Sequence, residues 1–135
     1  MKRIAVIVLL SLSFLLLAAC SSTSAPAFPG RNLHRASQFN AELGAAYIQR
    51  GKNKWALQKL TRALKENPDN AKAHSYIAVL YERLGEKAKA EIHFQDALEL
   101  IPDNMDLLNN YGVFLCGEKR FTEAEKYFTR VLANP

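Results

Sequence analysis

The residue types that most often build catalytic and metal sites are scarce in this chain. Its 135 residues include two cysteines and three histidines, and the histidines lie at positions 34, 74 and 93. There is no His-Glu-x-x-His motif and no glycine-rich phosphate loop, and the acidic residues are scattered rather than paired. These absences argue against an enzyme, and they predict no metal site and no cofactor.

The chain carries only a small excess of positive charge. Lysine and arginine outnumber the acidic residues by 18 to 13, for a formal charge of +5, which falls to +3 without the first 19 residues. Aromatic residues do not alternate with the basic ones as they do in nucleic-acid-binding surfaces, so we expect no nucleic acid to bind. The basic stretch 52–65 is interpreted as a solvated helix face, and contact with anionic lipid headgroups is the alternative.

One long apolar run is present, and it lies at the start of the chain. Residues 4–19 follow Lys2 and Arg3 and carry no charge, but 16 residues fall short of the roughly 20 that span a bilayer. The run ends in Leu17-Ala18-Ala19-Cys20, which resembles a bacterial lipobox. This resemblance implies that residues 1–19 are a cleaved signal peptide and that Cys20 carries covalent lipid. An ordinary signal peptide or anchor with an incidental cysteine is the alternative.

The residues after the lipobox bear on location and on redox state. Ser21, where some lipoproteins carry aspartate, resembles the pattern for the outer membrane, which implies the periplasmic face of that membrane. Residues 20–36 are rich in serine, proline and small side chains, so we predict a flexible tether. Once Cys20 is acylated, Cys116 has no partner in the chain. It is interpreted as a small buried or groove-lining thiol, with an intermolecular disulfide as the alternative.

From residue 37 onward the sequence repeats itself every 34 residues without gaps. Matching positions carry matching chemical types, for example a large apolar residue followed by a small one at Leu43-Gly44, Ile77-Ala78 and Tyr111-Gly112. In the second half of each unit the shared apolar positions are Ala56, Ala90 and Ala124, and Leu60, Phe94 and Phe128. The small residues predict close approach of two helices in each unit.

This period, together with the helix stops and turns in each unit, is typical of tetratricopeptide repeats. Pro68-Asp69-Asn70 recurs as Pro102-Asp103-Asn104, which places a helix stop just before a capping side chain. Gly51 and Gly85 mark the turn inside two of the units. We therefore predict an all-α solenoid of three helix-turn-helix repeats after the signal peptide and tether, at residues 37–70, 71–104 and 105–135, the last incomplete.

Stacked repeats of this kind offer a concave surface for another protein. Positions 2, 5, 9, 12 and 13 of each first helix are expected to line it, with a small apolar centre and a polar rim suited to a peptide. Packing against the neighbouring repeat is the alternative for each residue. The predicted partner-binding groove comprises Ala41, Ala45, Ile48, Gln49, Val79, Glu82, Arg83, Asn109 and Val113.

The third repeat carries a more specific resemblance. Residues 108–128 and the earlier stretch 47–51, together with the lipobox, resemble the PilF/PilW family of type IV pilus assembly lipoproteins, the pilotins. The resemblance implies an outer-membrane lipoprotein that binds secretin subunits and helps them reach the membrane and form multimers. A scaffold lipoprotein of another envelope assembly machine is the alternative, and a groove that binds nothing is the third interpretation.

The third repeat stops early by comparison with the first two. Pro135 lies one residue before the position of Pro68 and Pro102, and no polar capping helix follows it in the sequence. Either the chain is a fragment of a longer protein, or a partner or second copy covers the exposed end. Self-association would then use Phe121, Phe128 and Leu132.

Overall fold

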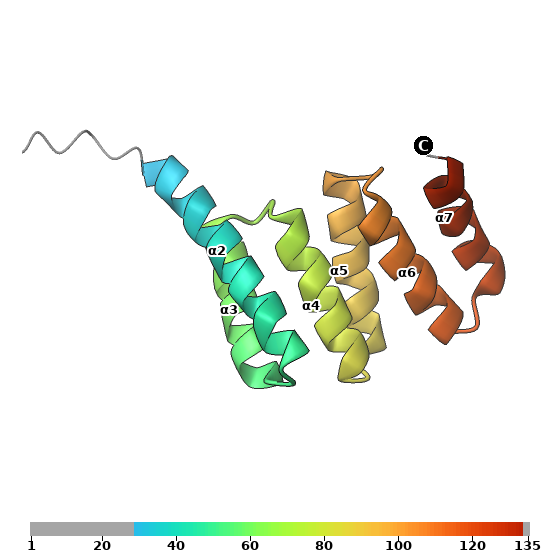
Figure 1. Ribbon diagram of the computed structural model, residues 1–135, viewed down its shortest axis with the longest axis horizontal. Helices are drawn as coiled ribbons and strands as arrows, with labels where there is room; N and C mark the ends of the chain where they lie inside the picture. Colours follow the sequence, from blue (N-terminus) through green and yellow to red (C-terminus); the bar gives the residue numbers. More distant parts are fainter. Residues whose placement is uncertain (1–28, 134–135) are drawn as a thin grey trace, which may run out of the picture.

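The computed structural model describes residues 29–133, and these residues form six α-helices and no strand. The helices pair as α2 with α3, α4 with α5 and α6 with α7, and the three hairpins stand in a row (Figure 1). The predicted solenoid of three helix-turn-helix repeats is confirmed. The helices are α2 (Pro29–Gln49), α3 (Asn53–Glu66), α4 (Ala71–Arg83), α5 (Lys87–Leu100), α6 (Met105–Gly117) and α7 (Phe121–Ala133).

Small residues set the distance between the helices of a hairpin, as the repeat pattern predicts. A Cβ atom added at Gly44 would lie 2.5 Å from Cγ of Leu60, and one added at Gly112 would lie 2.6 Å from Cε1 of Phe128. The large side chain of the second helix therefore occupies the space that a side chain on the first would need. Ala78, at the same position in the second repeat, is fully buried.

The core changes in character along the solenoid. Between the first and second repeats it includes a fully buried cluster of small residues, Ala41, Ala63 and Ala73. Between the second and third it is aromatic, because Phe94 packs 5.4 Å from Tyr111 and 5.3 Å from Phe114, measured between ring centroids. The aromatic cluster is the larger of the two and joins α4, α5, α6 and α7.

The turn inside each hairpin uses one residue with a left-handed backbone. Gly51 has φ 69° and Gly85 has φ 76°, and Lys119 occupies the same repeat position with φ 62°. The first two turns use the residue type that accepts this conformation without a steric penalty. The third keeps the conformation with a side chain present, so the turn geometry persists where the glycine does not.

Each inter-repeat loop ends in an asparagine that caps the following helix, as predicted. Asn70 Oδ1 accepts a hydrogen bond from the backbone N–H of Ala73 at 3.1 Å, and Asn104 accepts one from Leu107 at 3.0 Å. Asn70 also donates to Ser37 Oγ at 2.7 Å, and that fully buried hydroxyl donates to the carbonyl of Ala63 at 2.8 Å. The first cap therefore also links two repeats.

This difference predicts unequal costs for two otherwise identical substitutions. We expect Asn104→Ala to lower the free energy of unfolding by about 1 kcal/mol, the usual value of an N-cap. Asn70→Ala should cost about 1.5 kcal/mol or more, because it also removes a buried hydrogen bond to Ser37. Urea unfolding followed by circular dichroism measures both, and equal losses would contradict a linking role for Asn70.

The start of the first helix corrects one prediction. The tether was expected to extend through residue 36, but α2 begins at Pro29, so residues 29–36 are helical. Proline suits the first turn of a helix because its missing N–H would have no partner there. The predicted signal peptide, Cys20 and the rest of the tether lie outside the described residues. Within residues 29–133, none of the helices has the length and apolar character for crossing a membrane.

Candidate functional site

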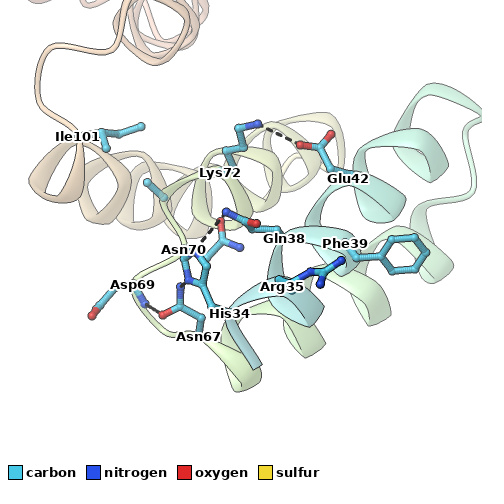
Figure 2. A pocket seen from close by; sticks show the side chains of 11 residues that line it. His34, Arg35, Gln38, Phe39, Glu42, Asn67, Asp69, Asn70, Lys72 and Ile101 are labelled. Carbon is cyan, nitrogen blue, oxygen red and sulfur yellow. Dashed lines mark hydrogen bonds and ion pairs between the residues drawn. The ribbon is translucent and has the colours of Figure 1, made fainter. Parts of the chain in front are cut away.

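A depression lies between the first two repeats, where α2 passes the start of α4. It has a volume of about 620 Å³, and most of the residues that line it are of polar or charged types (Figure 2). The lining residues are His34, Arg35, Gln38, Phe39, Glu42, Asn67, Asp69, Asn70, Ala71, Lys72 and Ile101.

A second depression continues the first toward the third repeat. It has a volume of about 340 Å³ and shares Ala71, Lys72 and Ile101 with its neighbour. Its other lining residues come from α4, from the start of α6 and from the cap of α6: Ser75, Tyr76, Asn104, Asp106, Leu107 and Asn110. The two depressions together form a trough that crosses all three first helices near their N-terminal ends, and we call it the first-helix trough.

Charged and amide groups organise the wider end of the first-helix trough. Lys72 Nζ lies 3.0 Å from Glu42 Oε1, so this ion pair joins α4 to α2 (Figure 2). The hydrogen bond and the charge of Glu42 raise the pKa of Lys72 above its ordinary value. The ring nitrogens of His34 lie 3.1 Å from Gln38 Nε2 and 3.3 Å from Asn67 Nδ2.

An exposed apolar side chain lies beside these polar residues. The side chain of Phe39 is 68% exposed, and in Figure 2 its ring points away from the other labelled residues. An exposed aromatic ring next to paired charges and amide groups gives a partner one apolar anchor and several orienting contacts.

Two residues of the predicted groove are not accessible to a partner. Ala41 is fully buried against Ala63 and Ala73, and Ile48 is 4% exposed and packs with Leu60. The prediction is wrong for Ala41 and Ile48, because the second repeat covers this side of α2. Packing against the neighbouring repeat, the alternative given for each groove residue, holds for these two.

The other predicted groove residues reach the surface to different degrees. Gln49, Arg83, Asn109 and Val113 are exposed, whereas Ala45, Val79 and Glu82 are half-buried. None of these seven lines the first-helix trough. For all seven, a role in partner binding remains a prediction.

Two of these seven residues already have structural surroundings that affect their chemistry. Arg83 Nη1 donates a hydrogen bond to the backbone carbonyl of Ile48 at 3.1 Å. This carbonyl lies near the end of α2, so a residue of the neighbouring repeat provides its hydrogen-bond partner. Burial raises the pKa of the Glu82 carboxyl. Arg83 therefore has a stabilising role between repeats whether or not a partner contacts it.

The repeat pattern could have predicted several of the trough residues. Gln38, Lys72 and Asp106 occupy position 2 of the three repeats and Ser75 occupies position 5, which are columns expected to face the concave side. The groove was predicted at later positions of the first helices, because small apolar residues gather there. Phe39 and Glu42 belong to columns outside that set, and no signal in the sequence singled them out.

The structure also places close together two histidines that are far apart in the sequence. His74 on α4 and His93 on α5 lie with their Nδ1 atoms 3.0 Å apart, and Asp96 adjoins both. The absence of a metal site therefore stays a prediction for these two residues, whereas His34 lies in the trough. Burial, with help from nearby His74, lowers the pKa of His93, and Asp96 opposes the shift. Cys116 is half-buried on α6.

The chain is similar to known proteins across the region just described. A family model for the tetratricopeptide repeat matches residues 41–104. The type IV pilus assembly protein PilF of Pseudomonas aeruginosa is 39% identical over 83 residues, which are 62% of this chain and 33% of that protein. An uncharacterized protein of Haemophilus influenzae is 31% identical over 117 residues, covering 87% of this chain and 64% of the other.

Solved structures agree with these sequence matches. The Pseudomonas aeruginosa PilF structure superimposes with a TM-score of 0.74 at 32% identity, covering 76% of this chain and 46% of that one. PilW, described as a widely conserved type IV pilus biogenesis factor, superimposes with a TM-score of 0.70 at 34% identity, covering 73% and 46%. The match spans less than half of each of these two structures. The described residues have the tetratricopeptide-repeat fold, and the chain is similar in sequence and structure to the PilF and PilW proteins of type IV pilus biogenesis.

Proposed function

We propose that this chain is a lipid-anchored protein of the outer membrane that binds secretin subunits and promotes their targeting and multimerisation in type IV pilus biogenesis. The observation that carries the proposal is the similarity to PilF and PilW in both sequence and structure. A repeat scaffold with a trough across its first helices supports a role in binding another protein.

The first-helix trough is the proposed contact surface. Its walls come from α2, α4 and α6, so a bound segment would touch all three repeats at once. Phe39 would anchor an apolar side chain of that segment, while Lys72 and Glu42 would orient it. Gln49, Asn109 and Val113 would extend the contact along the same helices.

The proposed lipid on Cys20 would hold this surface at the outer membrane. One acyl chain holds a protein to a membrane only marginally, whereas two or more make a stable anchor. Anchoring the binding surface and the secretin at one membrane raises their effective concentration, which favours assembly of a ring without any catalytic step. We propose no catalytic role and no cofactor beyond this covalent lipid.

A complementation experiment tests the proposal. Deleting the gene should abolish heat-resistant secretin multimers in the outer membrane, and the wild-type chain should restore them. We expect Phe39→Ala to weaken secretin binding at least about tenfold, because exposed aromatic residues in such surfaces often dominate the binding energy. Cys20→Ala should fail to restore outer-membrane multimers even when the protein is present in normal amounts.

Trp55→Ala is the matched control, since Trp55 is 55% exposed but lies on α3, outside the trough. It should restore multimers as well as the wild type does. If multimers persist at normal levels in the deletion strain, the secretin proposal fails, and the chain is better explained as a scaffold lipoprotein of another envelope assembly machine. If Phe39→Ala and Trp55→Ala bind equally well, the trough is not the contact surface.

A further inference from the structure

Three potential metal ligands converge on the outer side of the second repeat. His74 lies in the first turns of α4, and His93 and Asp96 lie one turn apart on α5. Their ligand atoms all lie within 4.8 Å of one another. The repeat pattern assigns no role to this group.

The distances within the group match those of a zinc site. His74 Nδ1 lies 3.0 Å from His93 Nδ1 and 3.2 Å from Asp96 Oδ2, and His93 Nδ1 lies 3.8 Å from the same oxygen. Zinc bonds of about 2.0–2.2 Å in a tetrahedron place the ligand atoms about 3.3–3.5 Å apart. The three observed separations bracket this value, so one ion above the triangle could reach all three atoms with small side-chain adjustments.

A backbone carbonyl selects the tautomer of the neutral His74 ring that a metal requires. His74 Nε2 lies 3.0 Å from the carbonyl oxygen of Pro68, which can only accept a hydrogen bond. The ring proton of neutral His74 therefore sits on Nε2, and the lone pair of Nδ1 faces His93 and Asp96. Such a second contact is the usual way in which proteins orient a metal-binding imidazole.

The ring of His93 is held in place, and the group opens to solvent. His93 stacks on Tyr81 at 5.8 Å between ring centroids with an interplanar angle of 21°. His74 and Asp96 line a depression of about 470 Å³ whose other residues include Asp69 and Glu99. The depression opens His74 and Asp96 to solvent, so an ion can approach the group from that side and keep a water molecule as its fourth ligand.

We propose that His74, His93 and Asp96 form a binding site for one zinc ion, with the two imidazole Nδ1 atoms and one carboxylate oxygen as protein ligands and water in the fourth position. Because the ligands come from α4 and α5, the ion ties together the two helices of the second hairpin. Its folding contribution therefore adds to that of the helix packing.

Calorimetric titration of the tag-free full chain with zinc chloride tests the site. We expect one ion per chain, and at least about tenfold weaker binding in His74→Ala, His93→Ala and Asp96→Asn. Asp96→Asn preserves the size of the side chain, so it tests the ligand even if an alanine variant folds poorly. Cobalt in place of zinc should give the intense visible absorption of a four-coordinate ion rather than the weak bands of a six-coordinate one.

His34→Ala is the matched control, because His34 is an exposed histidine that lines the first-helix trough instead. It should leave both affinity and stoichiometry unchanged. The proposal is overturned if the wild-type chain binds no zinc, if Asp96→Asn binds as tightly as the wild type, or if His34→Ala removes the binding.

Discussion

Phe94→Ala is expected to lower the free energy of unfolding by about 3–5 kcal/mol, the range for removing a buried aromatic side chain from a core. Phe94 is fully buried and lies between Tyr111 and Phe114 in the aromatic cluster that joins the second and third repeats. Its loss would leave a cavity bordered by rings from α6, which cannot close without moving that helix. The effect should therefore loosen two repeats rather than one.

Urea unfolding followed by circular dichroism measures this loss, and Phe121→Ala is the control. Phe121 is also a phenylalanine in a helix, but its side chain is 63% exposed. We expect its removal to change the free energy of unfolding by about 0.5 kcal/mol or less. Similar losses in the two variants would mean that the aromatic cluster is not the main connection between the second and third repeats.

Gly44→Ala should be destabilising by about 2–3 kcal/mol, although alanine is the better helix former, because the added methyl group overpacks the interior. The new Cβ would lie 2.5 Å from Cγ and 2.7 Å from Cδ2 of Leu60. Leu60 is fully buried, so its side chain cannot move out of the way without displacing its core neighbours. Helices α2 and α3 would have to separate, which weakens the first hairpin along its length.

Gly117→Ala is the matched substitution for Gly44→Ala. An added Cβ at Gly117, in the last turn of α6, has no atom within 4 Å. We expect this variant to be neutral or more stable by up to about 0.5–1 kcal/mol, because alanine restricts the unfolded chain. A Gly44→Ala protein as stable as the wild type would show that Leu60 has room to move and that the small position is not required.

The period of 34 residues predicted most of the fold because each repeat makes its contacts locally. The helix pairs, the small residue at Gly44 and Gly112, and the capping role of Asn70 and Asn104 all follow from columns that recur in register. Local patterns of this kind fix the helices and their partners within a hairpin. They carry little information about how one hairpin covers the next.

That missing information explains the errors in the predicted groove. At position 5 of the repeat, Ala41 is fully buried, Ser75 is half-buried and Asn109 is exposed. The column is the same, but a following repeat covers the first residue fully and the second partly. No further repeat follows α7 within the residues that the structure describes. Exposure therefore depends on neighbours as well as on position.

The histidine pair shows the same limit of local reasoning. His74 and His93 are 19 residues apart, so no short spacing motif connects them. Positions 4, 23 and 26 of the repeat meet across the hairpin, as His74, His93 and Asp96 demonstrate. Reading the repeat as a folded hairpin rather than as a linear pattern could have indicated this contact.

The unequal packing at the two inter-repeat junctions has a mechanical consequence. At the first junction the small cluster of Ala41, Ala63 and Ala73 lets the backbones approach over a longer stretch than at the second. Close backbone contact resists sliding of the helices, whereas at the second junction rings such as Phe94 and Tyr111 hold the backbones further apart. Under a bending force, the molecule should behave as an elastic rod with a stiff first joint and a compliant second one.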